Sequence, residues 1–358
     1  MDSKFILDGH KCIYHLDRIN DYLKGKKIAP ITIDWALTQS CPYNCIYCYA
    51  KMQQNPGDKI TREIAMNYIS DAAEIGVKAM SLVSDGESTI VPFFYDAVKY
   101  TKELGMDIAV GTCGYPLKIE KLPELLSNLT YLRFNISAAD TDRYCFIHGV
   151  PKEYYYKTLE IIKECIKIKE QNGLKVTLGL QMVLMPELSD QIIPMAELGR
   201  DLGIDYTIIK HCSDDEIGTL GIDYSKYKEL YPLLEKAERY STDRYLVKAK
   251  WSKIRTGRDR KYIQCYAPPL MLQTSGSGII APCGSFFNPK YRKYWIGDIS
   301  KGDRLKDLWK SDRYWKIMDI LSSKDFDART QCETLCLQDK VNEFLWDLKH
   351  PPEHVNFL

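Results

Sequence analysis

The sequence has no excess of charge of either sign and no long apolar run. Its 49 Lys and Arg residues almost cancel its 48 Asp and Glu residues, so no long-range field favours nucleic acid or an anionic membrane surface. No apolar stretch approaches the roughly 18 residues that a membrane span needs. The first residues, MDSKFILDGHKCIYHLD, are too polar for a signal peptide. We therefore expect a cytoplasmic protein that binds neither nucleic acid nor membrane.

Internal repeats and low-complexity tracts are also absent, and 358 residues, 45% of them apolar, are enough for a large buried core. From residue 31 to residue 212, short strand patterns alternate with helical patterns. The strand candidates are ITIDWALT (31–38), AMSLVS (79–84), MDIAVGTC (106–113), YLRFNIS (131–137), KVTLGLQMV (175–183) and DYTIIKHC (205–212). One helix between them, 61–76, has Thr61 to cap its start and Gly76 its end. This alternation predicts parallel βα units.

Three of these strands have one apolar and one polar face. In residues 131–137, for example, Leu132, Phe134 and Ile136 alternate with three polar residues. A closed eight-stranded barrel fills its interior largely with apolar side chains, and a doubly wound sheet is apolar on both faces. The pattern therefore favours an α/β fold with a partial (β/α)6 TIM-like barrel and a wet, substrate-sized lumen.

The pattern changes after residue 212. An acidic loop (213–216), an amphipathic helix (225–240) and a basic stretch (253–261) precede a cysteine-bearing C-terminal segment. We expect four parts: an N-terminal extension (1–30), the barrel (31–220), a linker region (221–261) and a small α+β module (262–358).

Twelve cysteines in a reducing compartment indicate metal ligation or redox chemistry more than a disulfide framework. Three of them, Cys41, Cys45 and Cys48, lie in SCPYNCIYCYA, just after the first strand. Three thiolates cannot complete a tetrahedral site or a four-iron cluster by themselves, so one coordination position stays open. An open iron can chelate a small molecule and pass it one electron. Half of a zinc site, or three buried thiols, are the alternatives.

The run CPYNCIYC, with the aromatic Tyr47 before its third cysteine, resembles the cluster-binding loop of the radical S-adenosylmethionine (SAM) superfamily. The resemblance implies that a 4Fe-4S cluster on Cys41, Cys45 and Cys48 binds SAM and cleaves it reductively to a 5′-deoxyadenosyl radical. That radical abstracts hydrogen from an unactivated C–H bond, while the protein supplies position and excludes water. An electron donor such as flavodoxin or ferredoxin is implied as a partner.

The same resemblance implies further cofactor contacts. SDGES (84–88) stands where the family often has Gly-Gly-Glu-Pro, which makes Glu87 the candidate for holding the methionyl ammonium. Asp85 and Ser88 depart from that pattern and leave the backbone approach open. The candidate cofactor-binding residues are Tyr47, Glu87, Asn135 and Ser137, of which the last two resemble ribose and carboxylate contacts. The alternative is that these side chains only face water.

A second cysteine set occupies the last hundred residues: Cys265, Cys283, Cys332 and Cys336. Gly278 permits a tight hairpin between the first two, and CETLC returns the second pair after a helical stretch. The arrangement resembles the twitch module, a shortened form of the SPASM extension, and a full SPASM extension would need further cysteines here. The resemblance implies an auxiliary 4Fe-4S cluster with four Cys ligands. A zinc site on the same thiolates is the alternative.

Two other cysteines, Cys113 and Cys212, end predicted strands at the barrel mouth, where a thiol could return a hydrogen atom to a substrate radical. They could equally be small apolar residues. Lys210 and His211 precede Cys212 and offer a base. This group suits a polar small molecule or a sugar-like substrate.

Dehydrogenation is the favoured reaction, because an auxiliary cluster can take the electron that oxidation releases. The alternatives are a radical epimerase with a Cys hydrogen donor and a maturase of a ribosomally made peptide, although no separate peptide-recognition domain precedes the barrel. A non-catalytic iron–sulfur or zinc protein that binds a partner through its basic stretch 253–261 is the alternative of another class.

Overall fold

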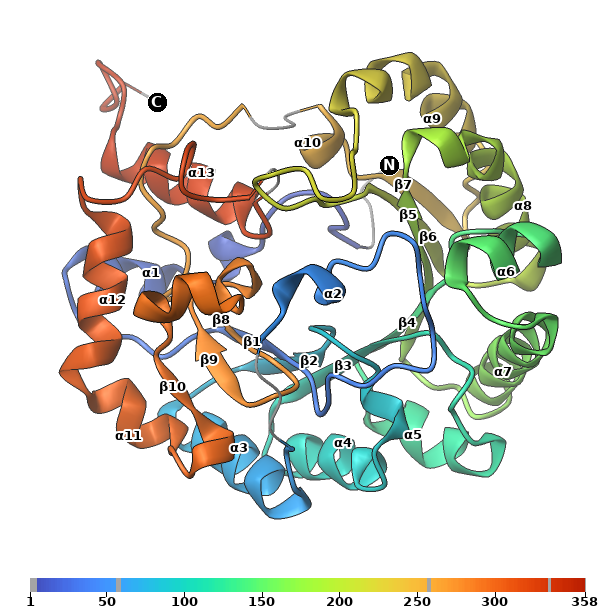
Figure 1. Cartoon of the computed structure of the whole chain (residues 1–358), viewed down its shortest axis with the longest axis horizontal. Coiled ribbons are helices and arrows are strands. Elements are labelled where there is room, and N and C mark those ends of the chain that lie inside the picture. Colours follow the sequence, from blue (N-terminus) through green and yellow to red (C-terminus); the bar gives the residue numbers. More distant parts are fainter. Residues whose placement is uncertain (1–4, 56–58, 256–258, 334–335, 358) are drawn as a thin grey trace.

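The computed structural model describes residues 5–55, 59–255, 259–333 and 336–357. One sheet of ten strands runs through these ranges in the order β10-β9-β8-β1-β2-β3-β4-β5-β6-β7 (Figure 1). The strands are β1 Thr32–Trp35, β2 Ala79–Leu82, β3 Asp107–Thr112, β4 Tyr131–Asn135, β5 Thr177–Leu184, β6 Tyr206–His211, β7 Leu246–Ala249, β8 Met271–Thr274, β9 Ile279–Ala281 and β10 Gly297–Asp298. The sheet curls without closing, since β7 and β10 are its two ends, and this confirms the partial barrel.

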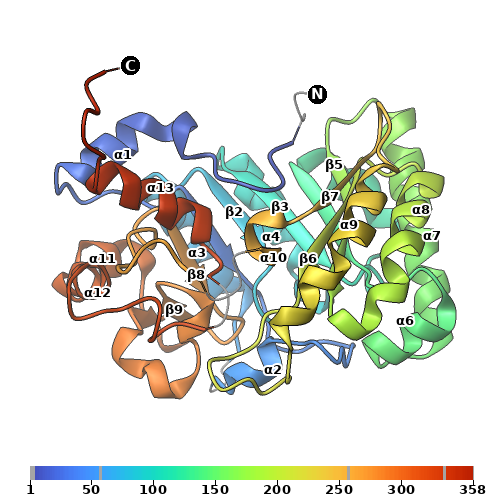
Figure 2. The same ribbon diagram turned by 90° about the horizontal axis from the view of Figure 1, so that it is seen from above.

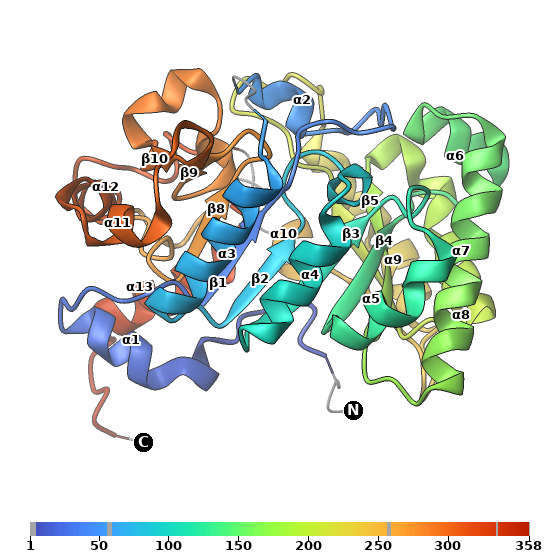
Figure 3. The same ribbon diagram turned by 90° about the horizontal axis from the view of Figure 1, so that it is seen from below.

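Helices cover the outer face of the sheet, and Figure 3 shows α3, α4, α5 and α7 side by side across it. The α-helices are α1 Leu16–Leu23, α2 Ala50–Gln53, α3 Arg62–Ile75, α4 Phe94–Glu103, α5 Leu122–Asn128, α6 Thr141–His148, α7 Lys152–Gln171, α8 Ile192–Leu202, α9 Tyr231–Glu238, α10 Trp251–Ile254, α11 Leu305–Lys310, α12 Asp312–Ser322 and α13 Asp339–Lys349. Short 3-10 helices include η2 Ser88–Ile90, η4 Pro186–Gln191 and η5 Tyr224–Leu230. Among the described residues, none of the helices is long and apolar enough to cross a membrane.

All six strands expected between residues 31 and 212 are present, as β1 to β6. Two more parallel strands extend this set, because β7 pairs with β6 and β8 pairs with β1, where Met271 lies opposite Thr32. The expected hairpin is β8–β9, and Gly278 occupies its turn with a φ of +99°. Cys265 and Cys283 lie just outside its two strands.

The expected alternation of faces is confirmed. Leu132, Phe134 and Ile136 are all fully buried, and they belong to the large core cluster between the sheet and its helices. The α3 helix that covers β1 and β2 begins as expected, since the Thr61 side chain accepts a hydrogen bond from the Ile64 N–H, and it ends at Gly76 with a φ of +94°.

Three loops meet backbone to backbone at one end of the barrel. A Cβ atom at Gly86, after β2, would overlap the carbonyl oxygen of Thr38, after β1, and a Cβ atom at Gly276, in the β8–β9 turn, would overlap the same carbonyl. The Asp85 carboxylate accepts a hydrogen bond from the Gly276 N–H at 2.6 Å. Glycine is therefore needed at both positions for close approach, and the contact fixes the C-terminal hairpin on the loops that follow β1 and β2.

Segments from the two halves of the chain also pack together on the opposite side. Figure 2 shows α1 beside α13, and a second apolar cluster joins them through Ile19 of α1 and Leu345 of α13. Farther along the N-terminal segment, the Asp8 carboxylate accepts hydrogen bonds from the Ser252 N–H at 2.9 Å and from the Ser252 hydroxyl. The N-terminal extension is therefore tied to both α13 and α10.

We predict that Gly86→Ala lowers the midpoint of thermal unfolding much more than Gly203→Ala. The two glycines have similar φ values, +71° and +77°, so each substitution carries the same left-handed strain of about 1–2 kcal/mol. Only Gly86 faces backbone atoms, whereas nothing lies within 4 Å of a Cβ at Gly203. Overpacking adds about 1–3 kcal/mol at Gly86. Equal midpoints for the two variants would contradict the close approach.

Candidate active site

The loop that carries the first three cysteines follows β1 and is held by the end of α6. The Asn44 N–H donates to the carbonyl of His148 at 2.9 Å, and the Ile46 N–H donates to that of Ile147 at 3.0 Å. These carbonyls belong to the last turn of α6, where they have no partner within the helix. The fold thus uses a helix terminus to fix the loop from Cys41 to Cys48.

The thiols of this loop lie close enough to affect one another. Cys41 is exposed, while Cys45 and Cys48 are half-buried. Burial raises the pKa of Cys45 to about 12, and the neighbouring Cys48 and Cys41 contribute in the same direction. Ligation by a cationic iron cluster would relieve this cost, because a metal binds the thiolate form.

His148 contacts the loop from below and was not identified from the sequence. Its Nδ1 lies 3.2 Å from the Cys45 Sγ, and its Nε2 accepts the backbone N–H of Ser137 at 3.1 Å. Because Nε2 is the acceptor, a neutral ring carries its proton on Nδ1 and donates it to sulfur. Burial lowers the pKa of His148 to about 3, so the ring stays neutral. The only sequence signal was a lone histidine before a helix-ending glycine.

Tyr47, Ser137 and Asn135 lie along β4 and the loop above it. The Ser137 hydroxyl donates to the Tyr47 hydroxyl at 3.0 Å and accepts the Val183 N–H at 3.1 Å, so it joins the loop to β5. Asn135 precedes Ser137 by two residues, so it faces the same side of the sheet. It accepts a hydrogen bond from the Gln181 side chain at 3.0 Å. Three of the expected cofactor contacts are therefore neighbours on one wall of the barrel.

Glu87, the fourth expected contact, is almost fully buried at the end of β2. Its Oε1 accepts the hydroxyls of Thr89 at 2.7 Å and Thr112 at 2.9 Å, and its Oε2 accepts the Cys113 N–H at 2.7 Å. The charge of Glu87 also contributes to raising the pKa of Cys41, which places the two side chains near each other. The carboxylate is thus held rigidly beside the first cysteine.

Asp85, which departs from the family pattern, has a structural partner. Besides the Gly276 N–H, its carboxylate accepts hydrogen bonds from the side-chain amides of Asn55 at 3.3 Å and Gln39 at 3.4 Å. The Asp85 side chain therefore connects the first cysteine loop to the C-terminal hairpin. A glycine at this position, as in the family pattern, could not form these bonds.

The second cysteine set is also brought together. The Asn342 side chain, on α13, lies 3.6 Å from the Sγ atoms of both Cys265 and Cys336. Burial raises the pKa of Cys265 well above its usual value, and Cys336, Cys332 and Cys283 all contribute in the same direction. The four side chains come from the segment before β8, the end of β9 and the stretch before α13.

The donors of both sets suit iron–sulfur clusters, since every one is a thiol. Arg260 lies close to Cys332 and Cys336, which raise its pKa against the effect of burial, and a cation there suits anionic ligands. Throughout the described ranges, no three side chains of His, Cys, Asp or Glu converge on a position for a single metal ion.

The end of β6 separates residues that the sequence placed together. Lys210 has the parity of Tyr206, whose ring lies over Gly179 on the inner face, so it projects inward. Cys212 follows the strand with the same parity and is fully buried. His211 has the opposite parity, and its ring meets those of Tyr224 and Tyr227 edge-on at 6.3 and 6.1 Å.

The protonation of these groups follows from their surroundings. Burial, followed by the charges of Arg133 and Lys253, lowers the pKa of Lys210 to about 7. Burial raises the pKa of Cys212 to about 12, which keeps it a thiol. Lys210 can therefore lose a proton near neutral pH, whereas Cys212 retains its own. Cys113, near Glu87, is likewise buried, and its pKa is raised well above the usual value.

Hydrogen bonds within the acidic loop after Cys212 hold its conformation. Asp214 accepts the N–H groups of Asp215 and Leu220, and Asp215 accepts that of Thr219, all at 2.9 Å. The loop forms one wall of a hollow of about 610 Å³ whose other walls are the first cysteine loop and residues 288–290. Cys45 and Cys48 line this hollow, so the cysteine loop borders a space of substrate size.

Comparison with known proteins identifies the domain that contains this site. Residues 35–198 match the family model described as the radical SAM superfamily, so the chain contains a radical SAM domain. The match begins within β1 and ends within α8. It therefore spans the first cysteine loop and the strands that carry Glu87, Asn135 and Ser137.

Three relatives illustrate the range of similarity. A tungsten-containing aldehyde ferredoxin oxidoreductase cofactor-modifying protein from Pyrococcus furiosus is 22% identical over 83% of this chain and 85% of its own length. An AdoMet-dependent heme synthase from Methanosarcina barkeri is 28% identical over 49% of this chain and 48% of its own length. The fold resembles Streptococcus suis SuiB, with a TM-score of 0.64 and 15% identity for the SAM-bound structure (86% of this chain, 72% of SuiB) and 0.64 and 16% for the complex with precursor peptide SuiA (100% and 84%).

We predict that His148→Ala lowers the free energy of unfolding of the metal-free protein by about 1–3 kcal/mol, because the buried Ser137 N–H loses its acceptor. The measurement is denaturant unfolding followed by tryptophan fluorescence. His350→Ala is the matched control, since His350 is exposed and its ring stacks on Trp346 of α13 and lies beside Tyr266. Equal stabilities of the two variants would show that the Ser137–His148 bond is not formed.

Proposed function

We propose that this protein is a radical SAM enzyme in which Cys41, Cys45 and Cys48 hold the SAM-binding cluster. The observation that supports this most is the placement of three mutually close thiols beside Glu87 at the mouth of a polar-lined, open barrel. A 4Fe-4S cluster there, reduced by a donor such as ferredoxin or flavodoxin, supplies the electron that converts SAM into methionine and a 5′-deoxyadenosyl radical.

The surrounding residues would position SAM. Glu87 is fixed by three donors and offers carboxylate charge to the methionyl ammonium. Tyr47, Asn135 and Ser137 present hydroxyl and amide groups on the neighbouring wall for the ribose and the carboxylate. Their mutual hydrogen bonds orient these side chains before the cofactor arrives.

Cys265, Cys283, Cys332 and Cys336 would hold an auxiliary 4Fe-4S cluster in a twitch-type module. Four thiols leave no open iron position, so this cluster supplies electron transfer and does not bind substrate directly. The cations Arg260 and Lys253 lie within electrostatic reach of these thiols, as expected around an anionic centre.

The reaction that suits two clusters is dehydrogenation of a hydroxyl-bearing small molecule or sugar-like compound. The radical removes a hydrogen atom from the carbon, a base removes the hydroxyl proton, and the remaining electron leaves to an acceptor, giving a ketone. Lys210 is the base that the structure favours, because it projects inward and has a pKa of about 7. His211 is less suitable, since its ring lies among Tyr224 and Tyr227.

Two other radical outcomes have specific support. The buried, protonated Cys212 projects inward at the mouth and suits hydrogen return in an epimerase, and Cys113 beside Glu87 is a second donor of this kind. The likeness of the fold to SuiB, whose structure contains a precursor peptide, favours a peptide substrate in the hollow bordered by the cysteine loop.

We predict that Cys41→Ala, Cys45→Ala and Cys48→Ala each abolish release of 5′-deoxyadenosine from SAM under strong reductant, because each removes one of only three ligands. Cys265→Ala and Cys332→Ala should lower the iron content by roughly half and retain some SAM cleavage, because they affect a separate cluster. Chromatography of the nucleoside and iron analysis are the measurements. Cys145→Ala, on the outer helix α6, is the control and should match wild type. Full cleavage by any variant of the first set would refute the ligand assignment.

We predict that the product is two mass units lighter than the substrate and carries no solvent deuterium at the reacting carbon when the reaction runs in deuterated water. Lys210→Met should then reduce turnover strongly, whereas Cys212→Ala should retain most of it. Mass spectrometry distinguishes the outcomes. Unchanged product mass with one deuterium incorporated, together with failure of Cys212→Ala to complete inversion, would establish the epimerase instead.

A further inference from the structure

Cations gather on the inner face of the barrel. Arg133 is the middle residue of β4, Lys210 lies near the end of β6, and Lys250 follows β7 with the same inward parity as Lys248. Lys253 reaches the same region from α10, a short helix that lies towards the middle of the molecule in Figure 2. Each of Arg133, Lys210 and Lys253 contributes to lowering the pKa of Lys250, after the larger effect of burial, so the four charges are near neighbours.

These cations lack partners. Within the described part of the chain, no hydrogen bond or ion pair involves the side chain of Arg133, Lys250 or Lys253, and the Arg133 Nε is buried without any acceptor. The carboxylates whose charges act on these cations are Asp34, Asp8 and Asp339, and each already accepts a hydrogen bond. Asp339, which acts on Lys253, accepts the Tyr262 hydroxyl at 2.8 Å. Asp34 accepts the hydroxyl of Ser81, and its pKa is raised by burial, while Asp8 accepts both polar groups of Ser252.

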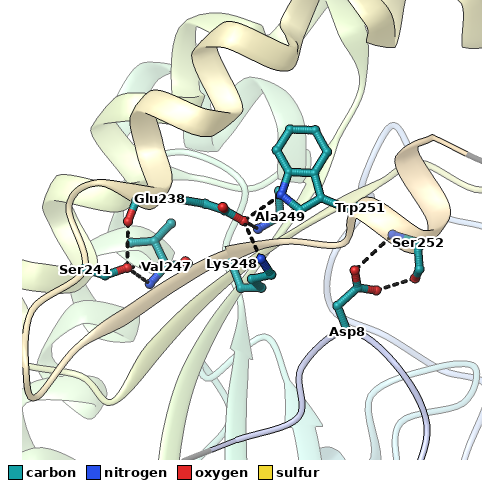
Figure 4. A network of polar contacts seen from close by, with 8 residues as sticks. All are labelled: Asp8, Glu238, Ser241, Val247, Lys248, Ala249, Trp251 and Ser252. Carbon is teal, nitrogen blue, oxygen red and sulfur yellow. Dashed lines mark hydrogen bonds and ion pairs between the residues drawn. The ribbon is translucent and has the colours of Figure 1, made fainter. Parts of the chain in front are cut away.

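The chain supports this arrangement with a dedicated scaffold, shown in Figure 4. Glu238 of α9 accepts the Ala249 N–H at 3.0 Å and the Trp251 indole N–H at 2.8 Å, so it fixes the residues on both sides of Lys250. Asp8 fixes Ser252, the residue before Lys253. Lys250 therefore lies between two residues that Glu238 fixes, and Lys253 follows a residue that Asp8 fixes, although among the described residues neither lysine forms an ion pair with a carboxylate.

Holding unpaired cations at half-buried positions costs stability, because their hydration is lost without a compensating charge. Burial lowers the pKa of both Lys250 and Lys253, because the charged form of each side chain loses hydration. A bound anion would restore the missing partner. Proteins commonly accept such local destabilisation where a ligand completes the site.

We propose that Arg133 and Lys250 form a binding site for the anionic part of the substrate, a phosphate or carboxylate group, inside the barrel. The inference deepens the proposed function, on which it rests. It predicts how the substrate is oriented. The anionic group lies inside the lumen, and the carbon that reacts lies towards the first cysteine loop. Lys210 lies one inward position below Cys212, continues the register of β6 and β7 beside Lys250, and remains available as the base.

The test uses the full chain with both clusters reconstituted anaerobically and SAM present at saturation, so that SAM does not compete for the site. Calorimetry measures the affinity for inorganic phosphate, for tricarballylate and for uncharged galactose. We expect the two anions, but not galactose, to bind and to raise the midpoint of thermal unfolding. The tighter anion identifies the group as phosphate or carboxylate.

Variants assign the binding to this site. Lys250→Met and Arg133→Met should each weaken anion binding at least about tenfold, because each removes a charged hydrogen-bond donor. Lys99→Met is the control, since Lys99 is an exposed lysine on the outer helix α4 that pairs with Glu124 at 3.3 Å, and this variant should bind anions like wild type. In the anion-free protein, Lys250→Met should keep or raise the unfolding midpoint, which a purely structural lysine would not do.

The proposal is overturned if neither anion binds more tightly than galactose, or if Lys99→Met weakens binding as much as Lys250→Met does. Release of 5′-deoxyadenosine from SAM, measured on the same preparations, separates this failure from failure of the proposed function. Cleavage of SAM without anion binding refutes the anion site alone, and anion binding without cleavage refutes the radical SAM activity alone.

Discussion

The contact among the loops after β1 and β2 and the β8–β9 turn is the constraint on which the rest of the molecule depends. Gly86 and Gly276 approach the same carbonyl of Thr38, and Asp85 binds the amide of Gly276. Through this contact the first cysteine loop, Glu87 and the hairpin that leads to Cys283 share one rigid junction. The relative placement of the two cysteine sets is therefore decided by backbone packing, which tolerates no side chain at either glycine.

Because the barrel is open, segments outside the strands can reach its inner face. Because β7 and β10 end the sheet without pairing to each other, the inner face stays accessible to polar residues from segments that are not strands. The α10 helix carries Lys253 to this region. There Lys253 interacts electrostatically both with the inner lysines and with the thiols of Cys336 and Cys283. The second cysteine set and the inner face of the sheet are thus linked electrostatically as well as through the strands β8 and β9.

Local sequence patterns predicted the strands β1 to β6 but not the strands that pair with them on either side. Strands β1 to β6 and their inward polar residues follow from alternation, which depends only on neighbours in the chain. The β7 strand is four residues long and includes Lys248, so its pattern resembles a loop, and the pairing of β8 with β1 has no local signal at all. His148 could not be found from the sequence, because its role depends on contacts with Cys45 and Ser137, which lie far away in the chain. The prediction grouped Lys210, His211 and Cys212, although alternation within β6 places His211 on the face opposite to the other two.

The pairing of β1 with β8 also determines when the fold can be completed. Thr32 lies opposite Met271, so about 240 residues separate the two strands along the chain. At a synthesis rate of about 5–20 residues per second, one edge of β1 waits for its neighbour for tens of seconds on the ribosome. During that interval β1 presents unpaired N–H and C=O groups beside the newly made cysteine loop, a template for intermolecular strand pairing. The order of elements in this chain therefore leaves one edge of β1 open to aggregation until residues 271–274 have been made.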